Sequence, residues 1–135
     1  MSRIAYVNGQ YVPHAEAQIH VEDRGYQFAD GVYEVAAIFR GRIIDEDGHL
    51  VRLKRSLDEL DMAMPMPDRP FAAVCRETLR RNRVQDGIIY IQVSRGVSRR
   101  DHPFPEDVKP ALVMTARAVD WPANADDDTG AEVVS

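Results

Sequence analysis

The sequence contains very little lysine: Lys54 and Lys109 are the only two in 135 residues, so nearly all of its positive charge is arginine. Any chemistry that requires a lysine amine therefore has only two candidates. The formal net charge is −5, which argues against non-specific binding to nucleic acid or to an anionic membrane surface. We accordingly expect no nucleic-acid partner and no membrane partner.

Cysteine is nearly absent as well, and the single Cys75 excludes a disulfide within the chain. This usage is typical of a reducing compartment. The sequence has no apolar run long enough to span a membrane and no N-terminal segment that is typical of a signal peptide. We therefore expect a cytoplasmic protein. The four histidines lie far apart without metal-ligand spacing, so no metal site is predicted.

Turn signals and apolar patterns predict strands at residues 4–7, 10–12, 32–39, 42–44, 88–93 and 111–118. The strand 32–39 is apolar on both alternating faces except at Glu34, which predicts burial on both sides. Two helices are expected between the fourth and fifth strands. The first carries an apolar stripe of Leu50, Leu53, Leu57, Leu60 and Met64.

Pro65 and Pro67 should end the first helix, and Asp68 is expected to cap the second. Cys75 falls on the apolar face of that second helix and is interpreted as a small core residue. This order predicts an α+β fold, a mostly antiparallel sheet with two helices on one face. We expect one domain at residues 1–120. Residues 121–135 are interpreted as an interdomain linker and the start of a truncated second domain.

The chain is organised around the stretch from Glu22 to Glu34, where a charged run breaks at Gly25 and Asp30-Gly31 leads into an apolar strand. Glycine permits turns that other residues avoid, and Asp-Gly is a turn signal. We expect a tight, polar corner lined by aromatic residues, which places Tyr33 near the mouth of the sheet. The alternative is a purely structural corner in which the aromatic side chains fill the core.

The loop Ser98–Pro105 places two arginines, a histidine and two prolines in one stiffened arm. An arginine fork with a neighbouring histidine donor is suited to binding a carboxylate, although a solvated basic loop remains an equal alternative. Arg52, in the first turns of the leucine-striped helix, could reach a phosphate. The competing interpretation is a surface ion pair with a helix carboxylate.

The motifs Asp-Arg-Gly-Tyr-Gln-Phe and Asp-Gly-Val-Tyr-Glu together resemble the N-terminal signature of fold-type IV, pyridoxal-phosphate-dependent aminotransferases. The resemblance runs from about Tyr6 to Val119, with Ala29 where the family usually has glycine. His49-Leu50-Val51-Arg52-Leu53 resembles the family's helix motif. Arg95-Gly96, followed by Arg100-x-His102, is similar to the substrate trap of the D-amino acid branch. The corner motif is shared with branched-chain aminotransferases and with aminodeoxychorismate lyases.

The resemblance implies that Arg52 holds the phosphate of pyridoxal 5'-phosphate and that Tyr33, Arg100 and His102 bind the substrate carboxylate. In the family, the arginine and histidine come from the other subunit of a homodimer. The implied reaction moves an amino group between a D-amino acid and a 2-oxo acid.

The family uses a lysine that forms a Schiff base with the cofactor, within a second domain. Neither Lys54 nor Lys109 matches that position. We therefore expect the chain to be the N-terminal domain of a longer enzyme, inactive alone, with the Schiff-base lysine beyond residue 135. The alternatives are a branched-chain aminotransferase, an aminodeoxychorismate lyase, or a non-catalytic binding or dimerisation module.

Overall fold

The computed structural model describes residues 3–121. The strands are β1 (Ile4–Val7), β2 (Gln10–Pro13), β3 (Gly31–Phe39), β4 (Arg42–Ile43), β5 (Gly87–Ser94) and β6 (Ala111–Ala118). The helical elements are η1 (His14–Glu16), α1 (Arg24–Phe28), α2 (Glu46–Glu59) and α3 (Asp68–Arg81). Except for Trp121, the predicted linker and second-domain start at 121–135 lie outside the described residues.

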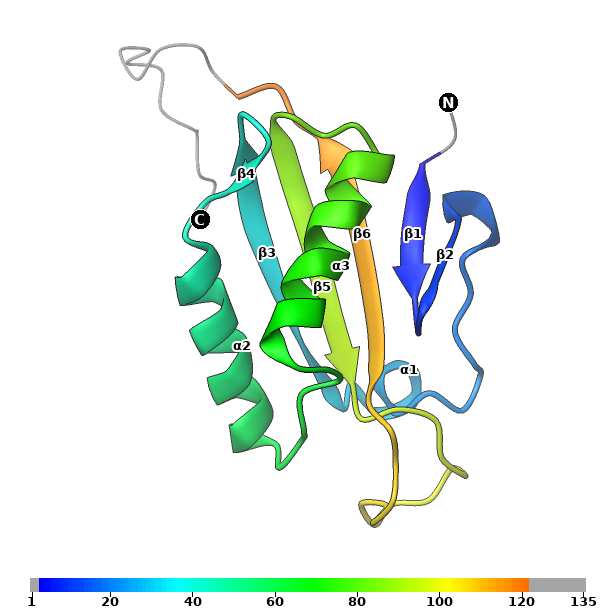
Figure 1. Ribbon diagram of the computed structural model, residues 1–135. Coiled ribbons are helices and arrows are strands. Elements are labelled where there is room, and N and C mark those ends of the chain that lie inside the picture. The colour runs from blue at the N-terminus through cyan, green and yellow to red at the C-terminus, as the bar shows by residue number, and fades with distance from the viewer. Residues whose placement is uncertain (1–2, 122–135) are drawn as a thin grey trace, which may run out of the picture.

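Within residues 3–121 the strands form a six-stranded sheet in the order β2-β1-β6-β5-β3-β4. Every neighbouring pair is antiparallel. The helices α2 and α3 lie over the same face of this sheet (Figure 1). The predicted α+β architecture, a mostly antiparallel sheet with two helices on one face, is therefore confirmed.

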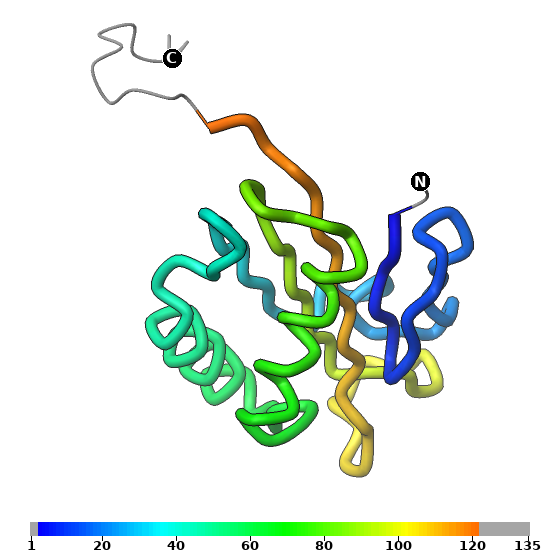
Figure 2. Tube along the Cα trace, turned by 45° about the horizontal axis from the view of Figure 1, so that its top comes forward, coloured from blue at the N-terminus to red at the C-terminus, as the bar shows by residue number. Residues whose placement is uncertain are grey.

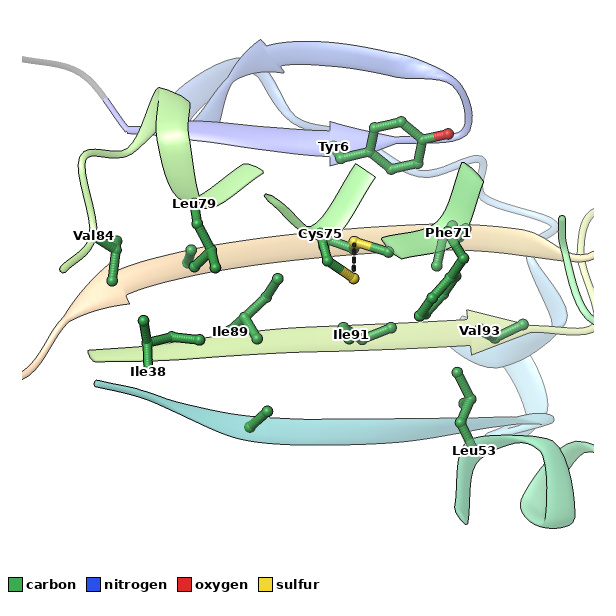
Figure 3. Close-up of a cluster of buried hydrophobic side chains, with 14 of the residues drawn as sticks. Tyr6, Ile38, Leu53, Phe71, Cys75, Leu79, Val84, Ile89, Ile91 and Val93 are labelled. Carbon is green, nitrogen blue, oxygen red and sulfur yellow. Dashed lines mark hydrogen bonds between the residues drawn. The ribbon is translucent and has the colours of Figure 1, made fainter. Parts of the chain in front are cut away.

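The core lies between that face of the sheet and the two helices (Figure 3). Alternation along β5 places Ile89, Ile91 and Val93 in the core, and the helices contribute Leu53 and Phe71, among others. Cys75 is buried there, as predicted. Burial raises the pKa of its thiol to about 12, so this thiol is inert at neutral pH.

The other face of the sheet departs from the prediction for strand β3, which we expected to be buried on both sides. Tyr33, Val35 and Phe39 point away from the helices and are exposed, Tyr33 by 66%. The sequence pattern gave a wrong prediction because β3 is apolar on both of its faces, whereas α2 and α3 cover only one face of the sheet. An exposed row of large side chains on a sheet face is suited to contact with a ligand or a partner.

Asp68 also differs from its predicted role. It is the first residue of α3 rather than its cap, and it makes no capping hydrogen bond with its side chain. Its carboxylate instead accepts a hydrogen bond from Lys54 Nζ at 2.6 Å, which joins α2 to α3 on the surface.

The short helix α1 occupies the predicted corner and packs on the uncovered face. Asp23 caps it, its side chain accepting a hydrogen bond from the Gly25 amide at 2.8 Å. A Cβ added at Gly25 would lie 2.8 Å from the Cβ of Ser94, whose side chain points away from the core. Glycine at this position therefore lets α1 approach the end of β5 closely.

Ala29 ends α1 in the left-handed conformation, with φ 55° and ψ 27°. A side chain is strained there, so we expect Ala29→Gly to raise the free energy of unfolding by about 1 kcal/mol. Urea denaturation will measure this gain. Ala17→Gly is the control, because Ala17 has an ordinary φ of −65° and glycine there should give no stabilisation. Equal effects at the two positions would contradict the prediction.

None of the helices between residues 3 and 121 is long and apolar enough to cross a membrane.

Candidate active site

Tyr33 stands on the uncovered face of the sheet, near the start of β3. Its ring stacks on that of Tyr90 with a centroid separation of 5.9 Å and an interplanar angle of 28°. The Tyr90 hydroxyl donates a hydrogen bond to Gln92 Oε1 at 2.6 Å. Because Tyr33 and Gln92 are direct cross-strand partners, these three side chains form one compact polar and aromatic group.

A hollow of about 190 Å³ opens beside this group. It is bounded by α1 and its C-terminal turn, by the start of β3 and by β5, with Gly25, Ala29, Gly31, Val32, Tyr33 and Gln92 lining it. The corner predicted from the sequence therefore does bring Tyr33 to a concave part of the uncovered face.

Arg52 is positioned by a carboxylate on β3. Its Nε and Nη2 donate to the two oxygens of Glu34, each at 2.7 Å, and Nη1 takes part in neither bond. Glu34 is 3% exposed and also contacts His49 Nδ1 at 2.7 Å. The ion pair that competed with the phosphate role thus exists, but its carboxylate comes from the strand instead of the helix.

The electrostatics of this cluster follow from its hydrogen bonds. The fork from Arg52 lowers the pKa of Glu34 against the opposing effect of burial, and His49 lowers it further. Glu34 in turn raises the pKa of Arg52, and the Tyr33 hydroxyl contributes to the same shift.

These residues fit a phosphate group. The side chain of Arg52 is 60% exposed, while the orientation of its guanidinium is fixed by a nearly buried carboxylate. A donor whose direction is set in advance loses little entropy when it binds an anion, and arginine matches phosphate geometry well.

Arg100 and His102 are brought together on the ring of Phe28, the last residue of α1. The Arg100 guanidinium lies over this ring at 5.2 Å from its centroid. The imidazole of His102 meets the same ring edge to face, with centroids 5.9 Å apart. Their loop lies at the same end of the domain as α1 (Figures 1 and 2). Within residues 3–121 no hydrogen bond joins Tyr33 to either residue.

The sequence interpretation missed several residues of this region. Glu34 and His49 were visible as a lone carboxylate in an apolar strand and as a residue one helical turn before Arg52. Arg24 and Phe28 lie within the motif Asp-Arg-Gly-Tyr-Gln-Phe, but the sequence assigned them no role, because their contacts depend on how the loop returns to α1. The two lysines lie apart from the groups described above: Lys54 is paired with Asp68, and Lys109 is exposed near the end of the loop.

No group of three or more histidine, cysteine, aspartate or glutamate side chains between residues 3 and 121 is arranged to hold a metal ion.

A sequence profile of the family described as "Amino-transferase class IV" matches residues 31–135. The chain therefore belongs to the class IV aminotransferases. D-alanine aminotransferase of Staphylococcus haemolyticus is 37% identical to it over 118 residues, which are 87% of this chain and 42% of that protein. The D-alanine aminotransferase of Listeria monocytogenes serotype 4b is 36% identical over 119 residues, or 87% and 41% of the two chains.

Solved structures share the fold. The branched-chain amino acid aminotransferase of Escherichia coli superposes with a TM-score of 0.81 at 16% identity, covering 93% of this chain and 42% of that one. The 4-amino-4-deoxychorismate lyase of Pseudomonas aeruginosa gives a TM-score of 0.69 at 24% identity, with coverage of 87% and 41%. The chain thus spans about two fifths of the length of the relatives that it matches.

Proposed function

We propose that this chain is the N-terminal domain of a pyridoxal-phosphate-dependent enzyme that transfers an amino group between a D-amino acid and a 2-oxo acid. Family membership and the likeness to D-alanine aminotransferases support the reaction class. The activity, the substrates and the homodimer of the whole protein are part of this proposal, as is its cytoplasmic location.

In this proposal each group of the site has a separate task. Arg52, held by Glu34, binds the cofactor phosphate. Arg100 receives the substrate carboxylate in its fork, and His102 and Tyr33 add hydrogen-bond donors. Pyridoxal phosphate, when bound, supplies the electron sink for the transfer. The task of this domain is therefore to bind and orient the substrate and the cofactor.

The observation that carries the proposal is the assembly of Arg100 and His102 on one aromatic ring. The sequence left open whether these residues form a carboxylate clamp or a solvated basic loop. Two cationic or donor side chains held against the same ring favour a clamp, because a merely solvated loop needs no shared support.

A homodimer is proposed because Arg100 and His102 are exposed on their loop and share no hydrogen bond with Tyr33 within residues 3–121. A loop of this kind is suited to completing the site of a second subunit, as the resemblance to the family implies.

The proposed substrate class is tested with the full-length protein. Amino transfer to 2-oxoglutarate is measured separately with D-alanine and L-alanine, in the presence of pyridoxal phosphate. We expect turnover with D-alanine and little with L-alanine. A preference for branched-chain L-amino acids as donors, or cleavage of 4-amino-4-deoxychorismate without amino transfer, would instead favour one of the two other enzyme classes that share this fold.

A second prediction concerns the lysines of this chain. We propose that neither Lys54 nor Lys109 bonds covalently to the cofactor, since Lys54 is held by Asp68 and neither lies in the groups around Arg52 and Arg100. Incubation of the 135-residue chain with pyridoxal phosphate, followed by borohydride reduction and mass mapping, should show no stoichiometric adduct at either residue. A single stoichiometric adduct accompanied by amino transfer would contradict this.

A further inference from the structure

Arg24 is a buried cation that is only 3% exposed, and it divides its donors between two parts of the chain. Its Nε donates to Asp30 Oδ2 at 2.8 Å, and its Nη1 donates to the main-chain oxygen of Asp101 at 2.9 Å. Asp101 is the residue between Arg100 and His102. Arg24 thus holds the main chain at the centre of the proposed carboxylate clamp, which consists of Arg100 and His102.

The ring of Phe28 provides a second connection between Arg24 and the clamp. The Arg24 guanidinium lies 4.6 Å from the ring centroid, and Arg100 and His102 contact the same ring. Cations over an aromatic face are attracted to it, and the attraction strengthens where water is excluded. Arg24 and Phe28 therefore support both side chains of the clamp from inside the domain.

The start of the loop is fixed to the same helix by the main chain. The Arg24 amide donates to Gly96 O at 2.9 Å, and the Ser98 amide donates to Glu22 O at 3.3 Å. Beyond Ser98 most of the loop is exposed as far as Asp107, so packing alone does not determine its path. The bond from Arg24 to Asp101 extends this support to the main chain between Arg100 and His102. Arg24 and Arg95 also lie over the Phe104 ring further along the loop, at 5.6 and 4.5 Å from its centroid.

We propose that Arg24 is a positioning residue for the substrate carboxylate, which pre-forms the clamp by fixing the main chain between Arg100 and His102. This inference rests on the proposed function. Pre-forming the clamp lowers the entropy that is lost when substrate binds. Arg24 touches neither substrate nor cofactor in this role, and its effect reaches them through Arg100 and His102.

Arg24→Lys tests the role selectively. A lysine keeps the charge that pairs with Asp30, but its single ammonium does not reproduce a fork that reaches two acceptors in different directions. In the 135-residue chain we expect the His102 amide to exchange with solvent about tenfold faster, because its segment loses an anchor made by a charged donor. This amide is a suitable probe because it donates to Asp101 Oδ1 at 2.9 Å.

In the full-length enzyme, Arg24→Lys should raise KM for the amino acid by about tenfold, with a smaller change in kcat. Retention of pyridoxal phosphate should stay at the wild-type level, because Arg52 lies outside this network. A role confined to stability would lower the unfolding temperature and leave both the His102 exchange rate and KM unchanged.

Arg95→Lys is the matched control. Arg95 Nε donates to the same oxygen of Asp30 at 2.7 Å, but its other donors reach Leu60 O and Asp61 O instead of Asp101. Its guanidinium also lies 4.5 Å from the ring centroid of Phe104 in the loop, where a lysine keeps the positive charge. The Arg95→Lys substitution should change neither the KM for the amino acid nor the exchange rate of the His102 amide. Equal effects of the two substitutions, or wild-type values for Arg24→Lys, would overturn the inference.

If Arg24→Lys does not fold, Phe28→Leu carries the test, with Phe39→Leu as its control. The guanidinium of Arg40 lies 5.1 Å from the centroid of the Phe39 ring, so this control also removes a cation–aromatic pair, but one that is far from the clamp. Only Phe28→Leu should raise KM and speed His102 exchange, and equal effects of the two would refute the inference. If the His102 amide exchanges faster in Arg24→Lys or Phe28→Leu while Arg100→Ala keeps the wild-type KM for the amino acid, the assignment of the clamp to Arg100 fails. The positioning role of Arg24 then fails with it.

Discussion

Replacing Asp30 by alanine should destabilise the domain by about 3 to 5 kcal/mol. Asp30 is 8% exposed and accepts hydrogen bonds from Arg24 and Arg95 on one oxygen, at 2.8 and 2.7 Å. Removing one partner of a buried ion pair leaves the other charge uncompensated, and that penalty has this magnitude. Since small domains are stable by only about 5 to 15 kcal/mol, the loss should be obvious in urea denaturation at pH 7.

Asp68→Ala provides the control for this prediction. Asp68 pairs with Lys54 at 2.6 Å, but its side chain is 54% exposed. Exposed ion pairs contribute at most about 1 kcal/mol, so this substitution should cost far less even though the contact is as short. Equal losses at Asp30 and Asp68 would show that the Arg24 network is not the buried anchor described above.

The contribution of Asp30 should also be visible in the pH dependence of the free energy of unfolding. Burial acts to raise the pKa of Asp30, but the hydrogen bonds from Arg95 and Arg24 outweigh it and hold the pKa below the ordinary 3.8. A carboxyl whose pKa is lowered by folding stabilises the protein above its unfolded pKa. The stability difference between wild type and Asp30→Ala should therefore be fully present above about pH 5 and shrink as the pH falls through the folded pKa.

The elements governed by local pattern were predictable from the sequence. The strands 4–7 and 111–118 were predicted with the bounds that they have in the structure. The two long helices were also predicted, but α2 ends at Glu59, so Leu60 and Met64 of its predicted stripe lie beyond it, and the chain leaves the helix before Pro65. Their apolar periodicity and turn residues act over short distances, so they can be read without knowing the rest of the fold. The helix α1 was not foreseen, because its five residues include a glycine and depend on Asp23, Gly96 and β5 for their support.

The candidate site was predictable only in part, for a related reason. Tyr33, Arg52, Arg100 and His102 were selected by chemical type, spacing and resemblance to a family. Their supports, Glu34 and Arg24, act through tertiary contacts with residues 18 and 77 positions away. The sequence shows Arg24 inside a charged run, which by itself favours a solvated position, and only the fold shows that the run turns inward at this residue.

The largest effect on activity is expected for Arg100→Ala in the full-length enzyme. If the Arg100 fork binds the substrate carboxylate in a site closed to water, losing that charged partner costs about 2 to 5 kcal/mol. At about 1.4 kcal/mol for each factor of ten, kcat/KM for the amino acid should fall at least about thirtyfold. Steady-state kinetics with D-alanine as the varied substrate will measure this, and retention of pyridoxal phosphate should barely change.

Arg52→Ala should show the reverse pattern. Loss of its guanidinium removes the proposed phosphate donor, so we expect weaker retention of pyridoxal phosphate on dialysis, with activity partly restored by excess cofactor. The Arg100→Ala enzyme should not recover in this way, because its defect lies in binding the substrate. Recovery of both variants, or of neither, would contradict the separation of tasks between the two arginines.

Arg99→Ala is the internal control for the clamp. Arg99 is adjacent to Arg100, is exposed and carries the same charge, so a general electrostatic attraction of carboxylates to the loop would involve both residues almost equally. Of these two neighbours, Arg100 is the one whose guanidinium lies over the Phe28 ring in the structure of residues 3–121. Arg99→Ala should therefore remain near the wild-type kcat/KM. If it proves as damaging as Arg100→Ala, the loop attracts substrate by its overall charge, and the assignment of the clamp to Arg100 is wrong.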